Sequence, residues 1–138
     1  MQNIVFSEVK NISSDKLNEL FQKIGWRIRL PQAWPLVLEK SSFVISAWVN
    51  NQLIGFGRIM EDGVMCMLYD IGVDPVFQRK GVGTKIMEKL IDKIKDNNYV
   101  SIGLFTWEEN PSNISFYEKF GFEKVETGME LVKYMQRE

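Results

Sequence analysis

The segment QRKGVGTK, residues 78–85, places two glycines one residue apart at the start of a helical pattern. Glycine is unfavourable inside a helix, so Gly81 and Gly83 indicate that this position needs bare backbone. The first turn of a helix has unpaired N–H groups and about half a positive charge, and both attract phosphate. Arg79 and Lys80 add full positive charges beside them. The segment therefore predicts a local binding site for a pyrophosphate group.

Two common phosphate-binding loops do not match this segment. The loop of nucleoside triphosphatases ends in Gly-Lys followed by Ser or Thr, whereas the order here is Gly83-Thr84-Lys85. The dinucleotide fingerprint G-x-G-x-x-G would require glycine at the position of Ile86. A simpler alternative is that the two glycines only shape a connection between a strand and a helix.

The composition bounds the classes of partner that we expect. The chain has 138 residues, 45% hydrophobic and 25% charged, which suits one globular domain. Its net charge of −1 gives no overall field for nucleic acid or an anionic membrane, so an anion site must be local. The chain has no histidine, the commonest metal ligand, and we expect no metal site.

Cysteine usage and hydropathy indicate the compartment. Cys66 is the single cysteine, which excludes a disulfide within the chain and fits a reducing cytoplasm. Its place among methionines favours a packing role over a nucleophilic one. The N-terminal residues lack a signal-peptide pattern, and no apolar run approaches the roughly 20 residues that span a bilayer.

Apolar periodicity predicts a mixed α/β fold in a single domain spanning residues 1–138. We expect strands at 3–9, 64–73 and 99–106, a hairpin around Asn50-Asn51, and two terminal strands around Thr127-Gly128. Helices are expected over about 14–25, over 82–96 and from Pro111 onward, with a loop and room for a short helix near Pro31 and Pro35. The strands at 64–73 and 99–106 would flank a helical crossover within a mostly antiparallel, twisted sheet flanked by helices.

A longer match gives the glycine-containing segment a specific meaning. The pattern Gln78-x-x-Gly81-x-Gly83 follows a strand that ends at Val73 and precedes an amphipathic helix. This arrangement resembles the acetyl-coenzyme A signature of the GNAT superfamily of N-acetyltransferases. The later segment NPSNISFYEKFGFEKV resembles the family's second hallmark, N-x-x-x-x-x-F-Y-x-x-x-G-F. The resemblance covers nearly the whole chain, because the predicted elements follow the family's order.

The resemblance implies acetyl-coenzyme A as the cosubstrate. Its pyrophosphate would lie on the backbone N–H groups of the loop, and its pantetheine arm would pair like an added strand with the end of strand 64–73. A lone glycine at 72 fits close backbone approach or a bulge. The implied cofactor-binding residues are Ile71, Gly72, Val73, Gln78, Arg79, Lys80, Gly81, Val82, Gly83, Thr84, Asn110 and Phe116.

Two residues are candidates for catalysis, Tyr117 by its match to the family and Asp70 because a carboxylate inside an apolar strand is costly unless it is paired or hydrated. Attack of an amine on a thioester needs a neutral amine, a stabilised oxyanion and a proton for the leaving thiolate. Tyr117 matches the family's general acid, and core packing is its alternative. Asp70 is a candidate water-mediated base or clamp for the substrate amine, beside Tyr69, which stands where many relatives have glutamate. Its alternative is a buried ion pair with an arginine or lysine.

The acceptor is expected near the loop after the first helix, GWRIRLPQAW. Candidate acceptor-binding residues are Trp26, Arg29, Trp34 and Trp107. Aromatic rings suit cations and flat groups, whereas arginines suit carboxylates. An aromatic core with solvated arginines is the alternative to a pocket.

We therefore expect a cytoplasmic N-acetyltransferase that moves an acetyl group from acetyl-coenzyme A to a primary amine of a small molecule. The amine would attack directly in a ternary complex, without a nucleic acid or membrane partner. A non-catalytic acyl-coenzyme A sensor and a protein or peptide N-acetyltransferase stay open as alternatives. The resemblance is also compatible with a homodimer.

Overall fold

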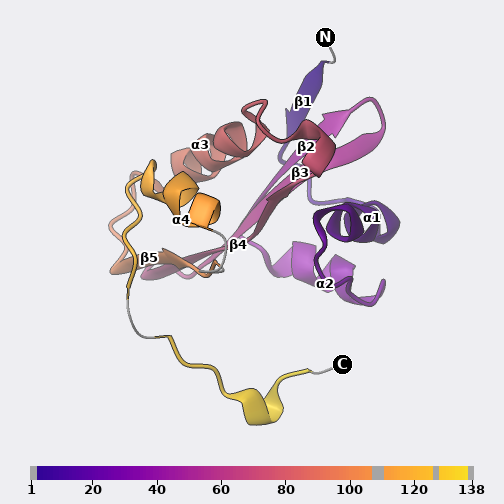
Figure 1. Ribbon diagram of the computed structural model, residues 1–138. Coiled ribbons are helices and arrows are strands. Elements are labelled where there is room, and N and C mark those ends of the chain that lie inside the picture. Colours follow the sequence, from indigo (N-terminus) through magenta and orange to yellow (C-terminus); the bar gives the residue numbers. More distant parts are fainter. Residues whose placement is uncertain (1–2, 107–110, 126–127, 137–138) are drawn as a thin grey trace. The chain divides into compact units, whose positions relative to one another are not determined.

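The computed structural model describes residues 3–106, 111–125 and 128–136 (Figure 1). The chain divides into two compact units, Met1–Phe105 and Thr106–Glu138, and each is described by itself. The single domain expected from the sequence stays a prediction.

A five-stranded sheet forms the centre of the first unit, in the order β1-β2-β3-β4-β5. The first four strands are antiparallel neighbours, and β4 pairs with β5 in parallel. Helix α3 (Val82–Ile94) connects the parallel pair. The predicted mixed α/β fold, with one strand–helix–strand crossover in a mostly antiparallel sheet, is confirmed. The strands are β1 (Ile4–Ser7), β2 (Phe43–Val49), β3 (Gln52–Glu61), β4 (Met65–Val73) and β5 (Ser101–Leu104).

Helices cover both faces of this sheet. On one face, α1 (Ser14–Ile24) and α2 (Ala33–Lys40) share a core with Val44 and Phe56 of the sheet. Helix α3 lies on the other face. Its Ile86 side chain packs so close to Gly55 of β3 that an added Cβ there would come within 2.9 Å of it. Figure 1 shows α3 and the α1–α2 pair on opposite sides of the strands. The helices of the first unit therefore pack their apolar faces on the sheet.

Local backbone signals set the ends of several elements as the sequence predicts. Gly25 ends α1 in the left-handed region, with φ 93°, and its N–H donates to the carbonyl of Phe21 at 3.0 Å. Asn50, with φ 53°, makes the tight turn between β2 and β3. In the second unit, Gly121 has φ 95° and follows α4 (Pro111–Glu118). Each turn therefore uses a residue that tolerates positive φ.

The predicted terminal strand pair is wrong for the residues that are described beyond Gly121. These residues contain only the short helix η2 (Val132–Tyr134). Val125 and Met129 are exposed there, so no apolar layer stabilises a two-stranded ribbon within this unit. Strand β5 is also shorter than predicted and less buried, with Ile102 42% exposed, because it lies at the edge of the sheet.

Candidate functional site

The loop before α3 has the backbone conformation that the glycine spacing suggests. It follows the short helix η1 (Pro75–Phe77), which the buried carboxylate of Asp74 caps by accepting from the Val76 N–H at 3.0 Å. Arg79 and Gly81 both have positive φ, 63° and 82°. A left-handed arginine is a strained residue, and such strain concentrates at functional sites. Residues of positive φ next to residues of negative φ form the kind of turn in which backbone N–H groups can hold an anion.

The N–H groups of residues 79–84 donate to no described residue. On either side, the Gln78 N–H donates to Pro75 and the Lys85 N–H to Gly81, at 3.3 and 3.0 Å. Residues 78–81 are exposed, and a Cβ on Gly81 would meet no atom within 4 Å. The glycine is therefore required by its φ, and the space before the N–H groups is open to an anion.

Gln78 has a structural task in this loop. Its side-chain Nε2 donates to the carbonyl of Val73 at 3.1 Å, which ties the loop to the end of β4. The side chain of Lys80 lies over the Phe77 ring, 5.4 Å from its centre. The loop residues that the sequence predicts for cofactor binding are therefore together at the N-terminus of α3.

The end of β4 has a bulge on its β3 side and no strand partner on its other side. Tyr69 lies opposite Arg58 and Gly72 opposite Phe56, so two β4 residues face the single Gly57. The pairing of β4 with β5 ends at Leu68, before the bulge. Residues 69–73 thus have one edge without a strand partner from β5, which is the edge predicted to bind the pantetheine arm.

Gly72 is closely approached by side chains. A Cβ at this position would lie 2.6 Å from the Trp26 ring and 2.7 Å from Ile24. The predicted bulge is confirmed beside it, at Asp70 and Ile71. The missing side chain at Gly72 therefore makes room for the end of α1 and the residues after it.

Asp70 is held in an ion pair with two arginines. Arg29 donates from Nη1 and Nη2 to its two carboxylate oxygens at 2.8 and 2.9 Å, and Arg58 donates from Nε at 2.7 Å. Burial raises the pKa of Asp70, but the hydrogen bonds and charges of Arg29 and Arg58 outweigh it and hold that pKa below its ordinary value. A carboxylate that is engaged and weakly basic is a poor base. The structure shows the alternative, a buried ion pair with two arginines, and the catalytic role of Asp70 stays a prediction that this geometry does not favour.

Only some of the candidate acceptor-binding residues lie where an acceptor could reach them. Trp34 does not, because it is fully buried in the core and its Nε1 donates to Asn18 Oδ1 at 2.9 Å. Trp26 packs edge-on against Phe21, with ring centres 5.1 Å apart. Arg29 remains one-third exposed. Of the four acceptor candidates, Trp107 lies outside the described residues, as does Asn110 of the predicted cofactor-binding set.

Sequence reasoning missed two residues that organise this site. Arg58 stands alone as a charge in the apolar run of β3, and that isolation was a usable signal for a buried ion pair. Asn18 holds the backbone of Arg29 through two hydrogen bonds, at 2.7 and 3.0 Å. It lies among other polar residues of α1, so the sequence offers no signal for it.

In the second unit, Tyr117 lies on α4 among aromatic rings. Its ring centre is 5.1 Å from that of Phe116 and 6.1 Å from that of Phe122. Burial raises the pKa of Tyr117 to about 12. The phenol therefore stays protonated through the physiological pH range, which a proton donor requires.

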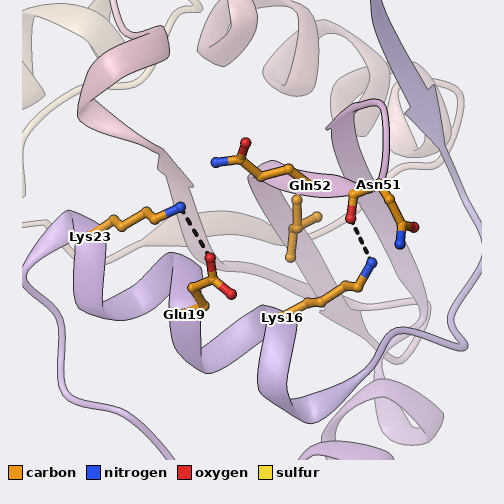
Figure 2. Close-up of a pocket in the computed structure, with 6 residues that line it drawn as sticks. Lys16, Glu19, Lys23, Asn51 and Gln52 are labelled. Carbon is orange, nitrogen blue, oxygen red and sulfur yellow. Dashed lines mark hydrogen bonds and ion pairs between the residues drawn. The ribbon is translucent and has the colours of Figure 1, made fainter.

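A shallow hollow between α1 and the turn from β2 to β3 is a weaker candidate (Figure 2). Lys16, Glu19, Lys23, Asn51 and Gln52 line it. Lys23 pairs with Glu19 at 3.2 Å, and Lys16 donates to the carbonyl of Asn51 at 2.5 Å. Its charged side chains are already paired within the chain, so we do not assign a ligand to this hollow.

The described ranges offer neither a ligand set for a metal ion nor a helix that could span a membrane. No cluster of three His, Cys, Asp or Glu side chains there could hold a metal ion. None of the helices described above is both long and apolar enough to cross a bilayer.

A sequence model of the Acetyltransferase (GNAT) family matches residues 6–122. The chain belongs to this family. It is thus an acyltransferase of a family that normally uses acetyl-coenzyme A as cosubstrate and acts on amines. The match includes the unpaired N–H groups before α3 and the tyrosine of α4.

Individual relatives agree with this assignment. The chain is 32% identical over 134 residues to "Uncharacterized N-acetyltransferase ycf52" of Porphyra purpurea, covering 94% of this chain and 75% of that protein. It is 39% identical over 58 residues to the "[Ribosomal protein bS18]-alanine N-acetyltransferase" of Salmonella typhimurium, covering 42% of this chain and 39% of that protein. The fold matches the probable acetyltransferase SA2161 from Staphylococcus aureus with a TM-score of 0.83, at 23% identity and over 94% and 98% of the two chains.

The ion pair of Asp70 predicts a pH-dependent contribution to stability. Replacing Asp70 by Asn keeps a residue that tolerates φ 57° but leaves two partly buried arginines without their anion. We expect the free energy of unfolding near pH 7 to fall by up to about 3 kcal/mol. Because the folded pKa is lowered, the wild-type advantage is full above about pH 4 and is lost as pH falls through the folded pKa.

Urea unfolding of both proteins between pH 2.5 and 8 measures this difference. The matched control is the exposed Asp96→Asn, which we expect to change stability by less than about 0.5 kcal/mol. A D70N variant as stable as wild type at pH 7 would show that the ion pair is not structural.

Proposed function

We propose that this GNAT-family chain transfers an acetyl group from acetyl-coenzyme A to a primary amine of a small molecule, by direct attack in a ternary complex. The observation that carries the proposal is the row of unpaired N–H groups at residues 79–84. They lie at the head of a 13-residue helix, beside two basic side chains. This arrangement fits a pyrophosphate on a chain whose net charge of −1 gives no other attraction for one.

The residues of β4 provide the second part of the proposed cosubstrate site. The pantetheine arm contains amides, and the edge at Ile71–Val73 without a β5 partner offers main-chain groups to pair with them, apart from the Val73 carbonyl, which accepts from Gln78. When bound, acetyl-coenzyme A supplies the thioester whose carbonyl carbon the amine attacks. In this proposal the loop and the strand edge orient that thioester, and Asn110 and Phe116 contact the arm.

We assign proton donation to Tyr117. As the carbon–nitrogen bond forms and the carbon–sulfur bond breaks, the thiolate that leaves takes the phenolic proton, and solvent takes the proton of the amine. The phenolate of Tyr117 then regains a proton from solvent, which restores the enzyme. Asp70 is bonded to two arginines, and the scheme assigns the role of general base to no described residue.

The compartment and the second candidate acceptor each have one supporting observation. Cys66 is a buried free thiol, and burial, with a smaller effect from Glu61, raises its pKa to about 11, which fits a cytoplasmic protein whose thiol is inert. A protein N-terminus is the second candidate acceptor, because one relative is named for the alanine of a ribosomal protein.

Substitution of Gly81 separates cosubstrate binding from general stability. Gly81 and Gly25 have similar positive φ, 82° and 93°, and a Cβ on either would meet no atom within 4 Å. We expect Gly81→Ala and Gly25→Ala each to lower the free energy of unfolding by about 1 kcal/mol. Only Gly81→Ala should weaken coenzyme A binding, by about tenfold. The loop backbone relaxes away from positive φ at residue 81, and the N–H groups then point away from the phosphates.

Calorimetric titration with coenzyme A, together with chemical unfolding, measures both effects. Equal affinity in the two variants would contradict the placement of the pyrophosphate at this loop. Absence of coenzyme A binding by the wild type would contradict the proposed function itself.

Removing the phenol of Tyr117 separates an enzyme from a sensor. We expect Tyr117→Phe to lower kcat by about a hundredfold and to change coenzyme A affinity less than twofold, because only proton transfer is lost. Since the pKa of Tyr117 is about 12, its acid form persists until pH rises toward that value, so this group should cause no loss of kcat below about pH 11.

Thiol release from acetyl-coenzyme A over a panel of amines, from pH 6 to 10.5, is the measurement. Unchanged kcat in the variant would remove Tyr117 from the mechanism. Wild-type coenzyme A binding without thiol release for any amine or peptide in the panel would favour the sensor.

A further inference from the structure

Two arginines hold the carboxylate of Asp70 in the first unit. Arg29 and Arg58 bond to it directly. Arg58 Nη1 also donates to Ser41 Oγ at 3.3 Å. We call Arg29, Arg58 and Asp70 the cationic cluster. Its two positive charges and single negative charge leave an excess of one positive charge.

Arg29 is the member of the cationic cluster that faces solvent, and it is fixed in place before any ligand arrives. Asn18 holds its backbone at both N–H and carbonyl. Its guanidinium lies 4.7 Å from the ring centre of Trp34 and 5.2 Å from that of Phe21, while one-third of the side chain remains exposed. A ligand that binds Arg29 would therefore lose little further side-chain entropy.

The cationic cluster retains donors that the chain does not use. No described residue accepts a hydrogen bond from Nε of Arg29 or from Nη2 of Arg58. The described part of the chain also has no buried side-chain nitrogen without a partner. These donors are therefore within reach of solvent and of a ligand oxygen.

The bulge of β4 places the cationic cluster beside the edge proposed for the pantetheine arm. Arg58 contacts both Tyr69, 5.0 Å from its ring centre, and Asp70, so the two consecutive β4 residues lie on the face of the sheet where Arg58 lies. Ile71 follows immediately on the open edge. A substrate that reaches the thioester from this face meets an excess of positive charge in a partly dehydrated setting, where such charge acts more strongly than in water.

The same observations weigh against a cationic acceptor. The excess charge repels an ammonium ion that has no compensating group. The aromatic rings that could otherwise attract an ammonium ion are not available to it, because Trp34 is buried and Trp26 packs on Gly72.

We infer that the acceptor is an amino carboxylate, whose carboxylate binds the cationic cluster through Arg29 while its amine attacks the thioester. This inference rests on the proposed function. A planar guanidinium held in one orientation matches a carboxylate in shape as well as in charge. Arg29 is then a specificity-determining residue, and Asn18 and Asp70 are positioning residues that orient it.

Matched acceptor pairs test the inference without any variant. Glycine, β-alanine and 4-aminobutanoate are each compared with the corresponding amide, at constant ionic strength, by thiol release from acetyl-coenzyme A. We expect kcat/KM to be at least about tenfold higher for the carboxylate in the pair of best length. Each amide has more neutral amine at a given pH than its acid, so this preference cannot come from amine reactivity.

The variant Arg29→Gln, with Arg29→Lys beside it, shows whether the preference resides in Arg29. We expect Arg29→Gln to lower the ratio of kcat/KM for the preferred amino carboxylate to kcat/KM for its amide by about tenfold, because any effect through the bulge of β4 acts on both substrates alike. Arg29→Lys should retain part of the preference, because it keeps the charge without the fixed fork.

A binding readout that needs no turnover completes the test. The melting temperature of wild type and Arg29→Gln is measured with 4-aminobutanoate, with its amide, and with sodium chloride at equal ionic strength. We expect 4-aminobutanoate to raise it in the wild type only.

The outcomes separate the inference from the proposed function. Equal or better use of the amides, or of cationic diamines, would overturn the inference while the transferase proposal stands. Carboxylate-specific stabilisation without turnover of any amine would support the inferred site and contradict the proposed function. No carboxylate effect on either turnover or melting would overturn the inference.

Discussion

Backbone hydrogen-bonding groups that the chain leaves unpaired are the constraint on which the site depends. Such groups are stable only where water or a ligand can reach them. The first unit has two of these places: the N–H groups of residues 79–84 and the edge of β4 beyond Leu68. One suits an anion and the other an amide-bearing chain, and both kinds of group occur in acetyl-coenzyme A. The two places follow each other along one stretch of chain, from the bulge to the first turn of α3.

Two strained residues create these openings. Asp70, with φ 57°, forms the bulge after which β4 has no partner on one side, and Arg79, with φ 63°, turns the loop before α3. Non-glycine residues with positive φ cost of order 1 kcal/mol or more, and the structure must hold them there. For Asp70 the holding groups are Arg29 and Arg58. The ion pair of Asp70 with these arginines therefore stabilises the bulge beside the edge proposed for the cosubstrate. We assign its excess positive charge to binding of the acceptor's carboxylate.

The sequence predicts those features whose cause is local. The hairpin at Asn50 and the helix stop at Gly25 each depend on one residue with an unusual φ, and the glycine spacing of the loop before α3 depends on a few neighbours. Features that depend on residues far apart in the chain could not be predicted from the sequence. The ion pair of Asp70 joins residues 41 and 12 positions apart, and the burial of Trp34 depends on how α1 and α2 pack on β3. The terminal strands were predicted from β-rich residues alone, yet strands need a partner edge, which local propensity cannot supply.

The most direct test of the account is the response of individual backbone amides to coenzyme A. Titration of the ¹⁵N-labelled protein, followed by amide chemical shifts, examines residues 79–84 separately from the rest of the chain. The account predicts the largest shifts and slowed hydrogen exchange at these amides, with the fragment pantetheine, which lacks the pyrophosphate, leaving them unchanged. Coenzyme A binding that leaves the amides of residues 79–84 unperturbed would contradict it.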